Sequence, residues 1–287
     1  MADQGIRKYS FQQAKADVVI SDPYNSYILI MPEKVVLVTG ANQGLGFAIV
    51  QVASLRHPSN TYILCSRDLN AGQQSVQKLR DLGVTAKIDL VQLDVTDDQQ
   101  IAAVARHVTD TYGKLDVLVN NAGIIRVPPQ NDLSGARKTY NEILNVNITS
   151  VAIVTTAFTP LLYKSSDPIV INLSSGLGSI QNSLTKKMGR SPPYGSSKIG
   201  VNGLTVHMQV AENDRVEAEG TSDKPLIRFY VCAPGPLKTA FTNFWPNGRS
   251  PEDGAEVIVQ LLADDSKKYD GGSYWEYVDN QMKVVPW

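Results

Sequence analysis

The chain has 287 residues, of which 43% are hydrophobic and 19% charged, a composition that suits one α/β domain with a full core. It holds 27 basic and 28 acidic residues, so the formal net charge is −1 and there is no excess of positive charge. We therefore expect no nucleic acid and no anionic membrane as a partner.

Short β-branched runs alternate with helical segments from Lys34 onward, whereas residues 1–33 do not fit this pattern and are treated as an N-terminal extension of unassigned function. Strands are predicted at residues 35–39, 61–65, 88–93, 115–120, 169–173 and 227–232. Nearly continuous apolar strands separated by helices indicate a parallel sheet covered on both faces. Residues 34–287 are therefore expected to form a single doubly wound Rossmann-type α/β domain.

The segments between the strands carry apolar residues at three- and four-residue spacing, which predicts amphipathic helices. Helices are predicted at residues 45–55, 71–82, 99–112, 136–163, 194–211 and 251–262. The charged segment 212–224 contains Gly220 and has no apolar period, so it is predicted to be a solvated loop. A last strand near residues 273–278 would complete the sheet.

Residue types that mark compartments and metal sites are sparse. The N-terminal segment carries Asp3 and Asp17 and lacks the basic start and apolar centre of a signal peptide. Cys65 and Cys232 lie in predicted strands, which favours buried thiols and a reducing, cytoplasmic location. The three histidines are scattered, so we expect no metal site.

Three glycines lie between the first predicted strand and the first predicted helix. Without Cβ atoms, Gly40, Gly44 and Gly46 allow a tight turn and close approach of a pyrophosphate to the helix N-terminus. Their spacing differs from the G-x-G-x-x-G fingerprint, so a simple turn is the alternative interpretation.

The end of the second predicted strand bears on cofactor choice, because NAD enzymes place a carboxylate there against the ribose 2′-hydroxyl. This chain has Ser66 and Arg67, a hydroxyl and a guanidinium that suit a 2′-phosphate and thus NADPH. In the alternative interpretation, Arg67 is an exposed surface charge and Asp68 determines selectivity.

Tyr194 and Lys198 are four positions apart on a predicted helix, so their side chains share one face. A nearby ammonium favours the phenolate, so Lys198 is expected to lower the pKa of Tyr194 from its ordinary value of about 10. Alone, the pair is also typical of an ordinary helix surface.

Further motifs occur in an order that resembles the classical short-chain dehydrogenase/reductase family along nearly all of residues 34–287. They are Thr39-Gly-Ala-Asn-Gln-Gly-Leu-Gly46, Asp94-Val95, Asn120-Asn-Ala-Gly123 and Pro234-Gly-Pro-Leu-Lys-Thr239. The first of these, Ser66-Arg-Asp68 and Ser250-Pro-Glu-Asp-Gly-Ala255 are similar to carbonyl reductases that use NADPH. The resemblance implies NADP(H) held by Gly40, Asn42, Gln43, Gly44, Leu45, Gly46, Ser66, Arg67, Asp94, Val95, Asn121, Ala122, Gly123, Tyr194, Lys198, Pro234, Gly235, Leu237 and Thr239.

The resemblance also implies a catalytic set of Asn147, Ser175, Tyr194 and Lys198. In it Ser175 hydrogen-bonds the substrate carbonyl and Tyr194 donates the proton. Lys198 holds the nicotinamide ribose and lowers the tyrosine pKa, while Asn147 orders a water in the proton relay. Such a set couples hydride transfer to general acid catalysis. Ser174 is the competing serine, to which we assign a structural role at the strand end.

Two features bear on substrate and assembly. Tyr194 follows Ser175 by 19 positions (194 minus 175), longer than the common family spacing but much shorter than in monomeric carbonyl reductases, and Lys186, Lys187 and Arg190 fill the gap. We expect a homodimer or homotetramer.

Three aromatic residues follow Thr239, namely Phe241, Phe244 and Trp245. They are predicted to form an apolar lid over the substrate, with Leu177 and Ile180 as further pocket residues. The alternative interpretation is that the three aromatic residues pack against the sheet.

These interpretations together predict an oxidoreductase that uses NADPH to reduce a small hydrophobic or aromatic ketone, aldehyde or quinone. The first alternative is an NAD-dependent alcohol dehydrogenase, which would share the catalytic set and differ at Ser66 and Arg67. A second alternative, from another class, is a sensor or scaffold that binds a dinucleotide without chemistry.

Overall fold

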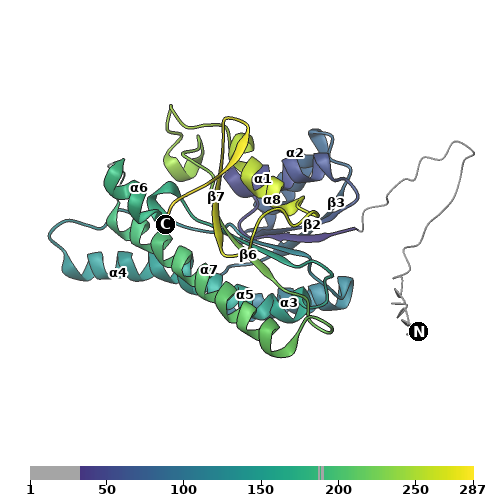
Figure 1. The fold of residues 1–287 in the computed structure, drawn as a ribbon. Coiled ribbons are helices and arrows are strands. Elements are labelled where there is room, and N and C mark those ends of the chain that lie inside the picture. The colour runs from purple at the N-terminus through teal and green to yellow at the C-terminus, as the bar shows by residue number, and fades with distance from the viewer. Residues whose placement is uncertain (1–32, 187, 189–190) are drawn as a thin grey trace, which may run out of the picture. The chain divides into compact units, whose positions relative to one another are not determined.

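A computed structural model describes residues 33–186, 188 and 191–287, so the predicted extension falls almost wholly outside the described residues, as do Lys187 and Arg190. Eight strands form one sheet in the order β3-β2-β1-β4-β5-β6-β7-β8 (Figure 1). Their bounds are β1 Val35–Val38, β2 Thr61–Ser66, β3 Lys87–Gln92, β4 Val117–Asn120, β5 Ile169–Leu173, β6 Arg228–Ala233, β7 Ser273–Val278 and β8 Gln281–Val284. All neighbours pair in parallel except β7 and β8. The predicted doubly wound parallel sheet is confirmed, and β8 is an antiparallel addition that the sequence did not predict.

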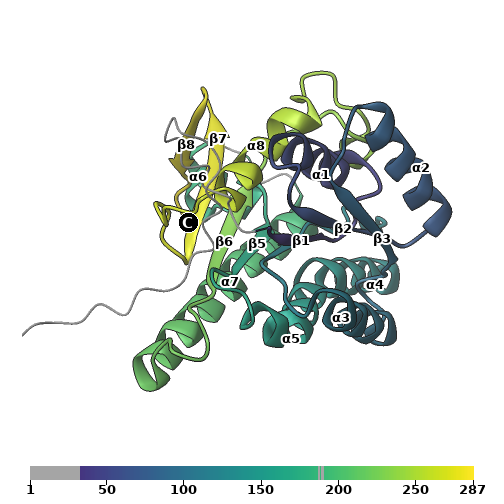
Figure 2. The ribbon, with the colours of Figure 1, turned by 90° about the vertical axis from the view of Figure 1, so that its right-hand side faces the viewer.

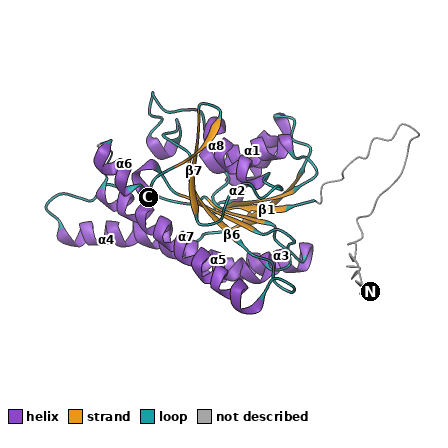
Figure 3. Cartoon of the chain, viewed as in Figure 1, coloured by secondary structure: helices purple, strands orange, loops and turns teal. Residues whose placement is uncertain are grey.

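Successive residues of the central strands point into two different cores. In β1, Val36 and Val38 belong to one buried cluster and Val35 and Leu37 to the other. This alternation follows from the two-residue period of a strand, and both faces are apolar because helices cover both (Figures 2 and 3). One face carries α1 Gly44–Arg56, α2 Leu69–Asp81 and α8 Pro251–Leu262; the other carries α3 Asp98–Tyr112, α4 Leu133–Leu144, α5 Ser150–Leu162 and α7 Pro192–Glu219.

A π-helical turn at Asn145–Thr149 joins α4 to α5 in one helix of 30 residues, which covers most of the segment predicted as a single helix. This helix is apolar and long enough to cross a membrane by length and composition. However, Phe158 and Leu162 are fully buried in the core beneath the sheet, as in a packed core helix. The π turn also buries Asn147 completely. Such turns recur at functional sites.

The prediction of a solvated loop over residues 212–224 is wrong for its first part, because α7 continues to Glu219. Glu212 is 6% exposed and accepts hydrogen bonds from the Arg215 guanidinium and from the backbone N–H of Ile227. Arg215 in turn donates to the backbone carbonyls of Lys224 and Pro225. A buried ion pair therefore extends the helix where the surface charge pattern indicated a loop, and Gly220, with φ of 74°, ends it.

The strand order reverses between β1 and β4, because the chain crosses from one half of the sheet to the other at this point. In doubly wound sheets, ligands bind in the crevice outside the carboxyl ends of the strands at such a reversal. The topology therefore places the candidate site at the ends of β1, β4, β5 and β6.

Candidate active site

Nearly all predicted site residues follow the carboxyl ends of the parallel strands. Predicted cofactor residues follow β1 (Gly40, Asn42, Gln43, Gly44, Leu45, Gly46), β2 (Ser66, Arg67), β3 (Asp94, Val95), β4 (Asn121, Ala122, Gly123) and β6 (Pro234, Gly235, Leu237, Thr239). Ser175 follows β5, whereas Asn147, Tyr194 and Lys198 lie on the helices beside this edge. Residues far apart in the sequence thus meet along one edge of the sheet.

The loop after β1 is shaped to receive an anionic group. Gly40 and Gly44 have φ of +61° and +57°, which L-residues with side chains rarely adopt. A Cβ on Gly46 would lie 2.5 Å from both the Asn121 Nδ2 and the Gly40 carbonyl oxygen. Gln43 directly precedes α1, and its side chain does not cap the helix, so the first N–H groups of α1 stay available to an anion. These features fit the pyrophosphate of a dinucleotide.

Thr39 and Asn121 lock the loop after β1 to the motif after β4. The Thr39 hydroxyl accepts hydrogen bonds from the backbone N–H of Asn121 at 2.9 Å and of Ala122 at 3.0 Å. In return, Asn121 Nδ2 donates to the carbonyls of Thr39 at 2.8 Å and Gly40 at 3.1 Å. Thr39 was not predicted as a site residue, although it opens the glycine motif.

The segment after β2 holds the residues expected to meet a 2′-phosphate. Arg67 is exposed, whereas the Asp68 carboxylate caps α2 by accepting hydrogen bonds from the N–H groups of Asn70 and Ala71. The Ser66 hydroxyl is fully buried and donates to the Asp68 carbonyl at 2.6 Å. The buried Ser66 hydroxyl therefore points toward its own loop, whereas the sequence analysis expected it to contact the 2′-phosphate. Arg67 is left as the exposed donor in this segment.

The segment after β3 has a stiff turn beside the expected adenine position. The Asp94 carboxylate accepts hydrogen bonds from the Thr96 N–H at 2.9 Å and the Thr96 hydroxyl at 2.7 Å. Gln100 Oε1 accepts from the Asp94 N–H at 2.8 Å, and Val95 is 8% exposed. Backbone geometry at this position is thus fixed by side chains of the turn itself.

The segment after β6 faces the glycine loop. A Cβ on Gly44 would lie 3.7 Å from the Cβ and Cγ2 of Thr239, which is itself 7% exposed. Leu237 is buried against α8, where a Cβ on Gly254 would lie 2.5 Å from its Cδ2. The Pro234–Thr239 loop therefore lies against the glycine loop at the contact between Thr239 and Gly44.

Lys198 and Asn147 meet the motif after β4 at Gly123. A Cβ on Gly123 would lie 3.7 Å from the Lys198 Nζ and 3.2 Å from the Asn147 Oδ1. The Lys198 Nζ also lies 5.6 Å from the centre of the Tyr194 ring and donates to the Leu173 carbonyl at 2.7 Å. Three of the four predicted catalytic residues therefore gather beside a segment predicted to bind the cofactor.

The side-chain amide of Asn147 forms hydrogen bonds within the protein through both its oxygen and its nitrogen. Its Oδ1 accepts from the Ile124 N–H at 2.8 Å, and its Nδ2 donates to the Ile124 carbonyl and the Ser197 hydroxyl, both at 2.9 Å. Both amide hydrogens are therefore used in holding the β4 motif against α7. A role for Asn147 in ordering a water stays a prediction.

The two adjacent serines have different surroundings. Ser174 is 4% exposed, and its hydroxyl donates to the Lys198 carbonyl at 3.4 Å, which ties the end of β5 to α7. Ser175 is half-buried; its hydroxyl accepts a hydrogen bond from the Leu177 N–H at 3.3 Å and lies near enough to the Tyr194 phenol to act on its pKa. Sequence analysis missed Tyr274 on β7, whose hydroxyl donates to the Ser175 carbonyl, because no local motif marks it.

Burial moves the two key pKa values in opposite directions. It raises the pKa of the Tyr194 phenol well above its ordinary value, against the opposing effect of the Ser175 hydrogen bond. Burial also lowers the pKa of Lys198 to about 8. The expectation that Lys198 holds the Tyr194 pKa below its ordinary value is therefore wrong for this structure, because desolvation of the buried phenol is the largest effect.

An exposed aromatic group flanks Tyr194. Phe241 is 41% exposed, and its ring centre lies 5.7 Å from that of Tyr194 at an interplanar angle of 60°. Phe244 and Trp245 are 60% and 45% exposed, so these aromatics do not pack against the sheet. Ile180, on the short helix α6 (Ile180–Thr185) of the Ser175–Tyr194 gap, is also exposed. The arrangement favours the lid interpretation over packing.

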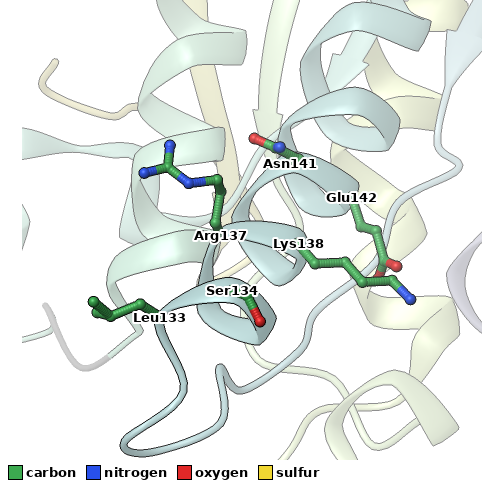
Figure 4. A pocket seen from close by; sticks show the side chains of 6 residues that line it. All are labelled: Leu133, Ser134, Arg137, Lys138, Asn141 and Glu142. Atoms are coloured by element: carbon green, nitrogen blue, oxygen red, sulfur yellow. The ribbon is translucent and has the colours of Figure 1, made fainter.

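A separate hollow of about 620 Å³ lies on α4 (Figure 4). Its lining residues are Leu133, Ser134, Arg137, Lys138, Asn141 and Glu142. All six come from one face of one helix, and none is a predicted site residue. It is an open helix surface, and we place the candidate active site at the strand ends instead.

Comparisons with known proteins agree with this geometry. The family described as short chain dehydrogenase matches residues 34–249. A short-chain dehydrogenase/reductase of Aspergillus fumigatus is 60% identical over 256 residues, which cover 88% of this chain and 97% of the relative. The human protein named carbonyl reductase [NADPH] 1 is 30% identical, with 88% and 98% covered. The crystal structure of NADPH-bound carbonyl reductase from chicken fatty liver is 28% identical, with a TM-score of 0.71 and 90% and 100% covered.

Proposed function

Because the chain belongs to the short-chain dehydrogenase family, whose members are oxidoreductases that bind a nicotinamide dinucleotide, we propose that it uses NADPH to reduce a ketone or aldehyde to an alcohol. The observation that carries this proposal is the pairing of two buried side chains, with the Lys198 Nζ 5.6 Å from the centre of the Tyr194 ring and the Ser175 hydroxyl near the phenol. The Lys198 amine lies beside Gly123, in the segment after β4 that also contacts Gly40 of the glycine loop, and this Cβ-free surface fits a dinucleotide.

In the proposed reaction, Tyr194 acts as the general acid. NADPH, when bound, would supply the hydride for reduction of the carbonyl carbon. The Tyr194 phenol gives its proton to the carbonyl oxygen, and the Ser175 hydroxyl stabilises the charge that develops on that oxygen. The raised pKa of Tyr194 keeps the phenol protonated at neutral pH, which is the form that reduction requires. Lys198 would hold the ribose hydroxyls and Asn147 the relay water.

The preference for NADPH rests on Arg67. The Arg67 side chain is exposed at the end of β2, whereas one carboxylate oxygen of Asp68 accepts the hydrogen bonds that cap α2. A guanidinium can pair with a 2′-phosphate through charge and two donors. The NAD-dependent alcohol dehydrogenase is the alternative, and measuring KM for NADPH and NADH with one substrate separates the two. Equal KM values, or a lower one for NADH, would contradict the proposal.

The substrate is proposed to be a small hydrophobic or aromatic carbonyl compound, because the exposed ring of Phe241 offers apolar surface beside Tyr194 and is followed along the chain by the exposed Phe244 and Trp245. The direct test follows NADPH absorbance against a panel of aryl ketones, quinones, aldehydes and sugar ketones. Fast oxidation with an aryl ketone or quinone is expected. NADPH binding without turnover across the panel would instead support a non-catalytic dinucleotide sensor.

Assembly as a homodimer or homotetramer is proposed through the helical face of α4, α5 and α7. This face leaves several apolar side chains partly exposed, namely Tyr140, Ile153, Ile199 and Val210 at 37% to 48%. Sedimentation equilibrium measures the mass directly, and a mass near 31.3 kDa at all concentrations would contradict assembly.

A further inference from the structure

We infer that Arg249 is a positioning residue that fixes the Pro234–Thr239 loop, an inference that rests on the proposed function because this loop would support the nicotinamide half of the cofactor. The Arg249 Nη2 donates to the Pro234 carbonyl at 2.5 Å, and its Nη1 donates to the Tyr277 carbonyl on β7 at 2.8 Å. One planar guanidinium therefore bridges the start of the loop and the neighbouring strand.

The backbone of Arg249 holds the same loop further along. Its N–H donates to the Pro236 carbonyl at 2.9 Å, and its carbonyl accepts from the Lys238 N–H at 2.8 Å. These bonds form an isolated parallel bridge between Leu237 and Arg249. Side chain and backbone together thus hold the loop at three successive points.

Gly235 shows that the loop is built around this guanidinium. Its φ is +79°, and a Cβ at this position would lie 2.8 Å from the Arg249 Nη2. A side chain there would displace the guanidinium as well as strain the backbone. No carboxylate pairs with Arg249 in any ion pair among the described residues, so the carbonyls are its partners.

Arg249 also links the Pro234–Thr239 loop to helix α8. It directly precedes Ser250, whose hydroxyl caps α8 by accepting from the Asp253 N–H at 3.0 Å. Helix α8 packs on α1 in one core, where Ile258 lies with Ile49, and α1 begins at the glycine loop. The loop held by Arg249 is therefore fixed relative to the segment that would bind the pyrophosphate.

The test separates the two halves of the cofactor by using NADPH and 2′,5′-ADP, a fragment that lacks the nicotinamide. In Arg249→Met, we expect the Kd of NADPH to rise roughly tenfold or more, because the loop loses the charge-assisted hydrogen bonds from Arg249 that hold it in place. The Kd of 2′,5′-ADP should stay within about twofold, since that fragment does not touch the loop. In Arg249→Lys, the Kd of NADPH should lie between the values for the wild type and Arg249→Met, because one ammonium cannot bridge both carbonyls. This variant also provides the test if Arg249→Met does not fold.

Arg56→Met is the matched control, because it removes the ion pair between Arg56 and Glu256 that joins α1 to α8 without touching the loop. Its affinities for both probes should equal those of the wild type. Unchanged NADPH affinity in both Arg249 variants, or equal weakening of both probes, would overturn the inference. A wild-type protein that binds neither probe would instead contradict the proposed function, and this inference with it.

Discussion

The Lys198 amine lies one helical turn from Tyr194 and 5.6 Å from the centre of its ring, and both side chains are buried. Burial favours the neutral form of each, so it raises the pKa of the phenol and lowers that of the amine to about 8. The proposed general acid, which must be protonated at neutral pH, thus lies beside an amine whose pKa is only slightly above neutral pH.

The pH dependence of activity should reflect Lys198. We expect kcat/KM for carbonyl reduction to fall as the pH rises through about 8, because the ammonium that would hold the ribose loses its proton. Stability should change in the opposite sense. Since the folded-state pKa lies below the ordinary 10.5, the unfolded chain binds more protons between these values, and the free energy of unfolding rises with pH across that window.

Both trends are measurable with pH–rate profiles and urea unfolding of the same samples. Lys198→Met should remove the rise in stability between pH 8 and 10.5. A rate that stays constant to pH 10.5, or wild-type stability that falls across the window, would contradict this assignment.

Arg67 should control cofactor choice. Arg67→Ala is expected to raise the KM for NADPH roughly tenfold or more, because a charge-assisted contact with the 2′-phosphate is lost. The KM for NADH should change little, and thermal stability should be unaffected because the side chain is exposed. Asp68→Ala is the comparison: if it, rather than Arg67→Ala, alters the NADPH to NADH ratio, then Asp68 sets selectivity.

Phe241 should affect large substrates selectively. Removing its ring in Phe241→Ala deletes the contact with Tyr194 and an apolar wall, so the KM for an aryl ketone should rise about fivefold, for a contact worth about 1 kcal/mol. A short aliphatic ketone should show little change. Leu82→Ala is a control, since this residue is 50% exposed at the end of α2. An equal effect on both ketones would argue against a lid.

Glu212 should matter for stability rather than for catalysis. It is buried and hydrogen-bonded to Arg215, Tyr163 and the Ile227 backbone, so Glu212→Gln removes the buried carboxylate that pairs with the half-buried Arg215 guanidinium. We expect a loss of about 3 kcal/mol in urea unfolding with KM unchanged. Glu219→Gln, 56% exposed on the same helix, should cost less than about 0.5 kcal/mol. Similar losses in the two variants would contradict the role of burial.

Sequence reasoning succeeded where a local pattern dictates the structure. The apolar runs that end near Val38, Asn120 and Leu173 identified central strands, because a strand covered on both faces needs apolar residues throughout. It failed at Glu212, where a charged sequence continues as helix and the buried carboxylate pairs with the half-buried Arg215. Charge patterns alone do not reveal which charges are buried together.

The same limit applies to the site. The residues of the glycine loop could be identified because backbone conformation constrains them to glycine. The direction of the Ser66 hydroxyl could not, since it depends on the fold of its own loop. Arg249 and Tyr274 act on backbone carbonyls of the Pro234–Thr239 loop and of Ser175, and such contacts leave no motif in the sequence.

The most direct test of the central claim is single-turnover NADPH oxidation by Tyr194→Phe with the best substrate of the panel. The lost hydroxyl should reduce the rate by about a thousandfold, within the range for general acid catalysis, while the Kd of NADPH stays within about twofold of the wild-type value. A variant that binds NADPH equally well and turns over at nearly the wild-type rate would contradict Tyr194 as the proton donor.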